Sequence, residues 1–390
     1  MKVAIIHDEL MRRGGAEQVV LTMLKSFPTA DIYTLAYNGD ATYPEYGNYK
    51  INTSVFQVFA KNVKVMHSLF FPFGIMAMKA MKITGYDVVI ISNTHCAKYV
   101  KIDAKSKVFM YTHTPFRLAW NPTSYTQYIQ SKGLYRLIFD TVISCLRRID
   151  ANSAKRGDFF IANTTQTALR IKEAYKIKQV FVIKPDVKVR NFYISEKPKK
   201  YYLLVSRLEY YKKVDLAIEA FNQLGLNLII VGDGTKAFEL RALAKSNISF
   251  VTNASNEELA NFYANCEAFI FPQHEDYGIT PLEANASGRP VIAYGKGGVL
   301  ETMIPYTGDA SKCTALFFEN QTVSDLAEAV LRYSDLKFDA NFIRAHAEKF
   351  DESVFIKTFR RFVLEKLNGK LLKNESASSN EEITVVEIAQ

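Results

Sequence analysis

Short runs of apolar residues alternate along the chain with longer segments in which apolar positions recur at helical spacing. This alternation is typical of parallel sheets whose two faces are covered by helices. The first half contains strand-like runs at residues 3–6, 31–35, 86–92, 107–112 and 159–163. The second half contains further runs at residues 201–206, 226–232, 248–251, 268–272 and 290–294. The pattern predicts an α/β protein with two doubly wound, Rossmann-like sheets.

The stretch at residues 183–200 separates the two halves and is charged, proline-bearing and poor in helical period, which favours a linker. We expect residues 1–185 and residues 186–345 to form separate domains, because 390 residues exceed what one core usually sustains. Ligands of open parallel sheets bind beyond the carboxyl ends of the strands, which predicts a site in a cleft between the domains. Residues 371–390 are polar and expected to be disordered.

The formal net charge of +9 suits an anionic partner such as nucleotide phosphates, nucleic acid or an acidic lipid surface. No zinc-finger or RNA-binding signature occurs, so no nucleic acid partner is expected. The four cysteines are scattered without metal-ligand spacing, which predicts a reducing compartment and no structural zinc. The apolar runs at residues 3–6 and 69–78 are too short for a signal peptide or a membrane span, so we expect a cytoplasmic protein.

The stretch QHEDYGITPLE leaves the predicted strand 268–272 as a loop, where α/β enzymes place their chemistry. Glu275 is therefore expected to face a ligand. Backbone N–H groups at Gly278, Ile279 and Thr280 open a helix and can meet a phosphate. Glu283 has two interpretations, since it can bind a ligand or complete a capping box with Thr280.

The stretch SRLEYYKK follows the predicted strand 201–206. Arg207 and Lys212 are placed there to clamp a pyrophosphate, the arginine by its planar fork and the lysine as a point charge. An ordinary solvated loop is the alternative. No Asp-x-Asp occurs in the chain, so we predict no metal site, and the fixed cations would take the place of a divalent ion.

Two motifs of the first half can also contact a ligand. Gly14 and Gly15 follow the first strand and allow close backbone approach, although they lack the G-x-G-x-x-G spacing. His113 follows the predicted strand 107–112 and can hydrogen-bond a sugar or move a proton, with Trp120 nearby to stack on a ring. A buried histidine with a structural role is the alternative.

Together these motifs resemble the retaining nucleotide-sugar glycosyltransferases of family 4, which have the GT-B fold. The resemblance covers most of the chain, from HDEL and GGAE through YTHTPFR and SRLEYYKK to EDYGITPLEANASGRPVIAYGKGG. It is closest to bacterial mannosyltransferase-like members that build O-antigen, capsule or exopolysaccharide. It implies an acceptor-side N-terminal domain, a nucleotide-sugar-binding C-terminal domain, and a helix within residues 346–370 that returns to the first domain.

The resemblance also assigns roles to residues. It implies that Glu275 contacts the donor sugar and that Glu283 contacts the ribose. It implies that Arg207 and Lys212 bind the pyrophosphate and that His113 lies near the transferred sugar. The loop residues that would approach the donor are then Gly14, Gly15, Tyr277, Gly278, Ile279 and Thr280.

The expected reaction is metal-independent transfer of a hexosyl group, with mannosyl from GDP-mannose favoured, to a saccharide that is lipid-linked. No other cofactor is implied. Three alternatives remain open: a UDP-sugar as donor, a nucleotide-sugar epimerase of the same fold, and a catalytically silent scaffold subunit.

Two segments can contact an anionic membrane, which would place the protein at the inner face of the cytoplasmic membrane. Residues 56–82 combine aromatic residues, methionines and lysines, and residues 133–150 form a helix with a basic end. Core packing and ordinary helix capping are the respective alternatives.

Overall fold

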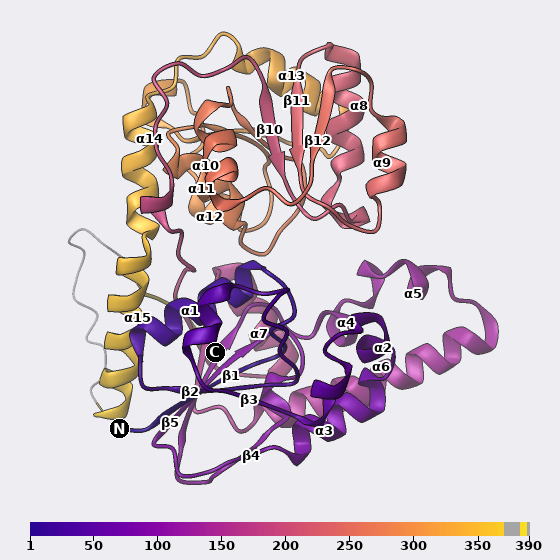
Figure 1. The fold of residues 1–390 in the computed structure, drawn as a ribbon, viewed down its shortest axis with the longest axis vertical. Coiled ribbons are helices and arrows are strands. Elements are labelled where there is room, and N and C mark those ends of the chain that lie inside the picture. Colours follow the sequence, from indigo (N-terminus) through magenta and orange to yellow (C-terminus); the bar gives the residue numbers. More distant parts are fainter. Residues whose placement is uncertain (370–382, 388–390) are drawn as a thin grey trace. The chain divides into compact units, whose positions relative to one another are not determined.

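The computed structural model describes residues 1–369 and 383–387. They form two compact units, an N-terminal unit of Met1–Pro185 with the described residues from Phe355 onward, and a C-terminal unit of Asp186–Val354 (Figure 1). Each unit is built around a large, mostly parallel sheet packed against helices. The predicted α/β class with two Rossmann-like sheets is confirmed.

The N-terminal unit is built on an eight-stranded sheet with the order β16-β9-β8-β7-β5-β1-β2-β3. Its strands are β1 (Val3–His7), β2 (Asp31–Thr34), β3 (Ile51–Thr53), β5 (Val88–Asn93), β7 (Lys107–Thr112), β8 (Phe159–Ala162), β9 (Gln179–Val182) and β16 (Thr384–Glu387). A separate pair is β4 (Lys82–Ile83) and β6 (Lys101–Ile102). The helices of this unit are α1 (Gly15–Ser26), α2 (Val63–Ser68), α3 (Ile75–Ala80), α4 (Arg117–Trp120), α5 (Thr126–Gln130), α6 (Gly133–Ala154), α7 (Thr165–Tyr175) and most of α15 (Glu352–Leu367).

Alternation along the strands produces two cores, one on each face of this sheet. In β1, Ala4 and Ile6 belong to one cluster of buried apolar side chains, whereas Val3 and Ile5 belong to the other. The second cluster also receives aromatic side chains of α15, among them Phe359. Burial on both faces explains why the strand sequences are almost continuously apolar.

The expected disorder of residues 371–390 is wrong at Thr384–Glu387. These residues form β16, which pairs antiparallel with β9 in the register Thr384↔Val182 to Glu387↔Gln179. Their β-branched side chains favour a strand, and an otherwise exposed edge at β9 provides the partner that the local sequence does not show. The rest of the predicted tail lies outside the described residues.

The C-terminal unit is built on a parallel six-stranded sheet with the order β12-β11-β10-β13-β14-β15. Its strands are β10 (Tyr202–Val205), β11 (Leu228–Val231), β12 (Ile248–Val251), β13 (Phe269–Phe271), β14 (Val291–Tyr294) and β15 (Ala315–Phe318). Its helices are α8 (Val214–Leu224), α9 (Ala237–Leu243), α10 (Asn256–Asn265), α11 (Ile279–Ala286), α12 (Val299–Thr302), α13 (Val323–Tyr333) and α14 (Ala340–Ala347).

The segment expected to be a linker packs into the C-terminal unit over much of its length. Val187, Val189 and Phe192 are buried in an apolar cluster of that unit, and the Val187 N–H donates to the Phe350 carbonyl at 2.9 Å. The linker prediction is therefore wrong for these residues, because they fill part of this core. Their apolar side chains are too sparse along the sequence to show a helical or strand period.

A buried ion pair connects four elements of the N-terminal unit. Lys98 Nζ lies 2.7 Å from Asp150 Oδ1, and both side chains are fully buried. Asp150 also accepts hydrogen bonds from Tyr99 at 2.9 Å, Tyr175 at 2.8 Å and the Trp120 indole at 2.8 Å. The proposed stacking of Trp120 on a ligand ring is not supported, because its polar group is committed to this carboxylate and its ring packs edge-on against Tyr175.

Within the part of the chain described here, no helix combines the length and the apolar character needed to cross a bilayer.

We expect Lys98→Met to lower the free energy of unfolding by about 3–5 kcal/mol, because it leaves the buried Asp150 charge without its cation. Lys107→Met is the matched control, since Lys107 pairs with Asp158 at 3.4 Å but is 54% exposed. That pair should contribute less than about 1 kcal/mol. Urea unfolding followed by fluorescence measures both variants, and equal losses would contradict the importance of the buried pair.

Candidate functional site

Two of the sequence-predicted site residues meet in the C-terminal unit. β10 and β13 are neighbours in the sheet, so the loops that follow their carboxyl ends lie side by side. Lys212, in the loop after β10, forms an ion pair with Glu275, in the loop after β13. The side chains are 12% and 22% exposed, so the pair is shielded from solvent but still accessible to a ligand.

Tyr211 connects the two predicted cations. Arg207 is exposed and donates from Nη2 to the Tyr211 hydroxyl at 2.7 Å. The Tyr211 ring centroid lies 6.0 Å from Arg207 Cζ and 5.2 Å from Lys212 Nζ, which is cation–π range. The sequence reasoning missed Tyr211, although an aromatic residue between two predicted phosphate-binding cations was a usable signal.

Helix α11 begins earlier than predicted. Its N-cap is Gly278, with φ +88°, and its first residue is Ile279, so Thr280 lies within the first turn. A Cβ at Gly278 would lie 3.0 Å from the Phe271 ring in addition to requiring a strained backbone. The expected helix N-terminus at Gly278, Ile279 and Thr280 is thus present. The N-cap is Gly278, two residues before the predicted cap Thr280, and the first N–H groups of the helix follow from there.

Glu283 does not form a capping box. Its Oε2 accepts a hydrogen bond from the Tyr263 hydroxyl of α10 at 2.7 Å, and burial raises the pKa of this carboxyl. The capping interpretation is wrong because the helix starts at Ile279 and places Glu283 beyond the first turn. Tyr263, which orients Glu283, could not be identified from spacing. The Tyr277 ring is buried in the apolar core, so its predicted contact with a ligand is limited to its backbone.

Glycines join the loop of Glu275 to the next loop of the sheet. The Gly298 N–H donates to the Glu275 carbonyl at 2.9 Å. A Cβ on Gly297, which has φ +87°, would lie 2.4 Å from the same carbonyl, and one on Gly298 would lie 2.4 Å from Tyr277 Cα. Only glycine at both positions allows this approach, which fixes the backbone that carries Glu275.

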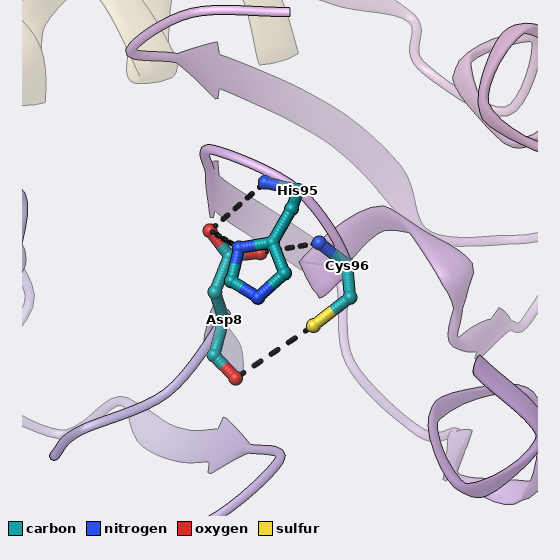
Figure 2. Close-up of side chains that lie close together, drawn as sticks. All are labelled: Asp8, His95 and Cys96. Carbon is teal, nitrogen blue, oxygen red and sulfur yellow. Dashed lines mark hydrogen bonds and ion pairs between the residues drawn. The ribbon is translucent and has the colours of Figure 1, made fainter. Parts of the chain in front are cut away.

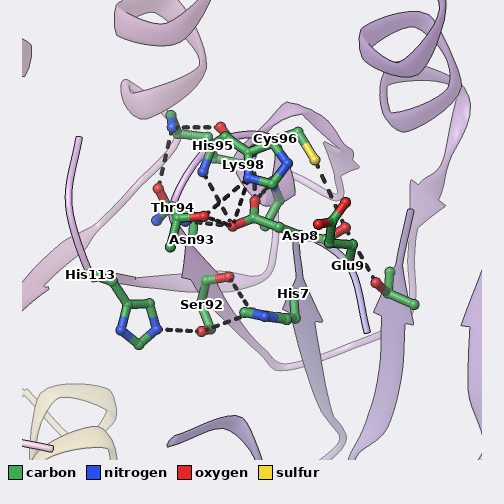
Figure 3. Close-up of polar contacts among 12 residues, drawn as sticks. His7, Asp8, Glu9, Ser92, Asn93, Thr94, His95, Cys96, Lys98 and His113 are labelled. Carbon is green, nitrogen blue, oxygen red and sulfur yellow. Dashed lines mark hydrogen bonds and ion pairs between the residues drawn. The ribbon is translucent and has the colours of Figure 1, made fainter. Parts of the chain in front are cut away.

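In the N-terminal unit, His113 follows β7 and is buried at the carboxyl edge of the sheet. Its Nε2 lies 2.9 Å from Ser92 Oγ, and Ser92 Oγ lies 3.1 Å from Nδ1 of His7 (Figure 3). Burial, and then the charge of His7, lower the pKa of His113 to about 4. His113 is therefore neutral near pH 7.

The space beside Gly14 is taken by a carboxylate of the chain itself. Glu17 is buried in the first turn of α1, and a Cβ on Gly14 would lie 2.4 Å from its Oε2. Burial would raise the pKa of Glu17, but the hydrogen bond and charge of His7 and the guanidinium of Arg12 lower it to about 2. Gly14 thus makes room for Glu17, and Gly15 is the exposed first residue of α1.

Asp8, His95 and Cys96 place a carboxylate, an imidazole and a thiol within 4.8 Å of one another (Figure 2). The carboxylate of Asp8 accepts from four backbone N–H groups, those of Thr94, His95, Cys96 and Ala97. Its oxygen lone pairs are therefore already used by the loop after β5, and burial raises the pKa of the Cys96 thiol to about 11. This chemistry fits a structural anchor better than a metal site.

The structure thus groups the predicted residues by unit. Arg207, Lys212, Glu275, Gly278, Ile279, Thr280 and Glu283 lie at the carboxyl edge of the C-terminal sheet. Gly14, Gly15 and His113 lie at the corresponding edge of the N-terminal sheet.

Comparison with known proteins shows which proteins this chain resembles. Residues 188–350 match the family model for glycosyl transferases group 1. The α-1,3/1,6-mannosyltransferase ALG2 of Candida glabrata is 23% identical over 405 residues, covering 86% of this chain and 85% of that protein. Its namesake in Dictyostelium discoideum is 26% identical over 395 residues, covering 84% of this chain and 88% of that protein.

Solved structures share the architecture. Anabaena HepE in complex with UDP is similar with a TM-score of 0.68 and 15% identity, covering 94% of this chain and 100% of that chain. Sucrose-phosphate synthase from Thermosynechococcus elongatus is similar with a TM-score of 0.68 and 15% identity, covering 95% of this chain and 100% of that chain. These likenesses show the two-domain GT-B fold.

We expect the burial of neutral His113 to make folding sensitive to acid. Its folded pKa of about 4 lies below the ordinary value of 6.5, so the unfolded chain binds the proton first as pH falls. The stabilisation is complete above pH 6.5 and is lost on acidification towards pH 4, by about 2 kcal/mol at pH 5. Urea unfolding at pH 7.5 and pH 5 measures the loss. His113→Gln should reduce it, whereas the exposed His274→Gln should retain it.

Proposed function

We propose that this chain, a glycosyltransferase with the GT-B fold, transfers a hexosyl group from a nucleotide sugar to a saccharide with retention of the anomeric configuration. Mannosyl from GDP-mannose is the favoured donor group, because the relatives that match over most of their length are named mannosyltransferases. The observation that carries the proposal is the cluster of Arg207, Tyr211, Lys212 and Glu275. It lies within the segment that matches the family.

The ion pair between Lys212 and Glu275 suggests how a donor would enter. A diphosphate carries more negative charge than one carboxylate, so it would draw the Lys212 ammonium away from Glu275. Glu275 would then be free to accept hydrogen bonds from sugar hydroxyls. Arg207, held on Tyr211, and the free N–H groups at the start of α11 would stabilise charge on the leaving nucleotide diphosphate.

The same groups would let the reaction proceed without a divalent ion. Fixed cations and a helix N-terminus supply positive charge where the phosphates would lie. The departing phosphate oxygen would take the proton of the acceptor hydroxyl, so no side chain is needed as a base. In this proposal Glu283, oriented by Tyr263, contacts the ribose.

A UDP-sugar remains the second candidate donor. Its support is the fold similarity to HepE, a protein solved in complex with UDP. The test therefore compares guanine and uracil nucleotides.

The acceptor is proposed to be a lipid-linked saccharide, reached by contact with an anionic membrane. Within residues 56–82, Met66 and Met78 are core residues, whereas Phe73 and Met76 are 55% and 61% exposed. This segment therefore serves both core and surface. The first half of α6 also presents Leu134 at 71% and Leu137 at 63% exposure. Exposed apolar side chains beside lysines suit an anionic bilayer.

The inner face of the cytoplasmic membrane and a role in bacterial surface polysaccharide synthesis remain predictions. The two mannosyltransferases named above come from Candida glabrata and Dictyostelium discoideum. We therefore propose the reaction and the class of acceptor. The identity of the acceptor would define the pathway.

We expect GDP and GDP-mannose to raise the melting temperature in the presence of EDTA. A ligand at a hundred times its Kd stabilises the folded state by about 2.7 kcal/mol. Arg207→Ala should lose most of this shift. Arg332→Ala is the matched control, because Arg332 is also exposed and lies over a tyrosine ring, at 5.1 Å from the Tyr306 centroid, in the same unit.

Other results would change the proposal in defined ways. A shift with uracil nucleotides alone would make the donor a UDP-sugar. A shift that EDTA abolishes would contradict the metal-free mechanism, and no shift with any nucleotide would favour the scaffold alternative.

We expect the double variant Lys79→Glu/Lys82→Glu to bind anionic liposomes at least about tenfold more weakly, since each lysine near such a surface contributes about 1 kcal/mol. Both lysines are exposed. Lys197→Glu/Lys200→Glu is the matched control, with the same spacing and charge change on exposed residues of the C-terminal unit. Equal binding by all three proteins in a sedimentation assay would contradict membrane contact through residues 56–82.

A further inference from the structure

A chain of hydrogen-bonding groups extends from His113 into the sheet (Figure 3). His113 Nε2 lies 2.9 Å from Ser92 Oγ, which lies 3.1 Å from His7 Nδ1. His7 Nε2 lies 3.9 Å from Glu17 Oε1. The residues come from β1, β5, the end of β7 and the first turn of α1. Ser92 and His7 are almost fully buried, so their protons must be placed among these partners.

The proton of His7 can be located first. Its Nδ1 lies 3.1 Å from the backbone carbonyl oxygen of Ser92. A carbonyl oxygen only accepts, so Nδ1 of His7 must carry the proton and donate it. This nitrogen therefore cannot accept a hydrogen bond from the Ser92 hydroxyl, and Ser92 Oγ is at most a second acceptor of the same N–H.

The Ser92 hydroxyl can then donate its hydrogen bond to one acceptor, His113 Nε2. In the part of the chain that the structure describes, Ser92 Oγ has no partners other than His7 Nδ1 and His113 Nε2. If His113 donated from Nε2, the hydroxyl proton would be buried without an acceptor, which is unfavourable. Donation from Ser92 to an unprotonated Nε2 satisfies every group, and it leaves the proton of neutral His113 on Nδ1.

We propose that Ser92, oriented by His7, holds His113 in the tautomer that carries its proton on Nδ1, so that His113 binds a sugar hydroxyl of the substrate as a neutral hydrogen-bond donor. The Nδ1 group has no hydrogen-bond partner among the residues described. Ser92 and His7 are positioning residues in this arrangement. The role toward a sugar rests on the proposed function, whereas the tautomer follows from the geometry alone.

The tautomer is tested on the unmodified protein by ¹⁵N NMR of the imidazole nitrogens at pH 7.5. His346 is an internal reference, because its Nε2 lies 2.7 Å from the Thr302 carbonyl and must therefore carry a proton. We expect His113 to show the opposite pattern, with Nδ1 protonated and Nε2 unprotonated. A protonated Nε2 on His113 would overturn the proposal whether or not the protein transfers sugars.

The role of the donor is tested by kinetics with the nucleotide sugar identified in the thermal-shift assay. An asparagine amide can replace Nδ1–H, whereas a glutamine amide extends to the position of Nε2. We expect His113→Asn to retain about tenfold more kcat/KM than His113→Gln, the value of roughly one hydrogen bond. The reverse order would show that Nε2 is the functional atom and would overturn the donor role.

Ser92→Ala tests the positioning step. We expect it to lower kcat/KM by about tenfold and to give His113 a mixed tautomer signal, because the hydroxyl donor is lost. Ser106→Ala is the matched control, since Ser106 is also buried in this unit but donates to the Tyr86 carbonyl at 2.7 Å. An unchanged tautomer signal and unchanged kinetics in Ser92→Ala would contradict the proposal. Loss of activity with an unchanged His113 signal would assign Ser92 a merely structural role.

Discussion

The carboxyl edge of the N-terminal sheet depends on one buried carboxylate. The carboxylate of Asp8, directly after β1, accepts hydrogen bonds from the backbone N–H groups of Thr94 to Ala97. Its Oδ2 lies 3.3 Å from His95 Nδ1. Burial opposes this charge, but His95 and the loop donors hold the pKa of Asp8 well below its ordinary value. The loop after β5 is fixed as a result, and Lys98, which follows it, reaches the Asp150 carboxylate. The hydrogen bonds of Asp8 thus order the loop and, through Lys98, the buried ion pair with Asp150.

The polar side chains at the carboxyl edges of the two sheets differ in burial and in the kind of contact they make. In the N-terminal unit, His7, Ser92 and His113 are buried and joined by hydrogen bonds with few alternatives. In the C-terminal unit, Arg207 is exposed, and Lys212 pairs with a partly accessible Glu275. A buried network resists rearrangement, whereas an accessible ion pair can exchange one anion for another. The N-terminal edge can therefore hold a side chain in one orientation, whereas the C-terminal edge can bind a new anion.

The comparisons and the geometry support different parts of the functional argument. The solved structures are 15% identical to this chain and show only the GT-B fold. The match of residues 188–350 to the family model and the mannosyltransferase relatives support a transferase enzyme. The geometry adds what neither provides, namely Tyr211 between the two cations, Tyr263 on Glu283 and the Ser92 link to His113. These contacts identify individual residues whose roles in the proposed reaction can be tested one at a time.

The sequence by itself determined the α/β class, nearly all the central strands and the residue types at the carboxyl edges. It could do so because buried parallel strands are apolar runs and because the loops after them follow directly in the chain. The tertiary structure decided which of those residues meet. Lys212 and Glu275 are distant in sequence and come together only because β10 and β13 are neighbours.

Three interpretations have the same physical basis. The capping alternative for Glu283, the ring contact of Trp120 and the disorder of Thr384–Glu387 each rested on local sequence. Each was decided by a distant partner: Tyr263 for Glu283, Asp150 for Trp120 and β9 for the strand. Local spacing records what a residue can do with its chain neighbours, but long-range packing chooses the hydrogen-bond partner, because buried polar groups and strand edges must be satisfied wherever a partner is available.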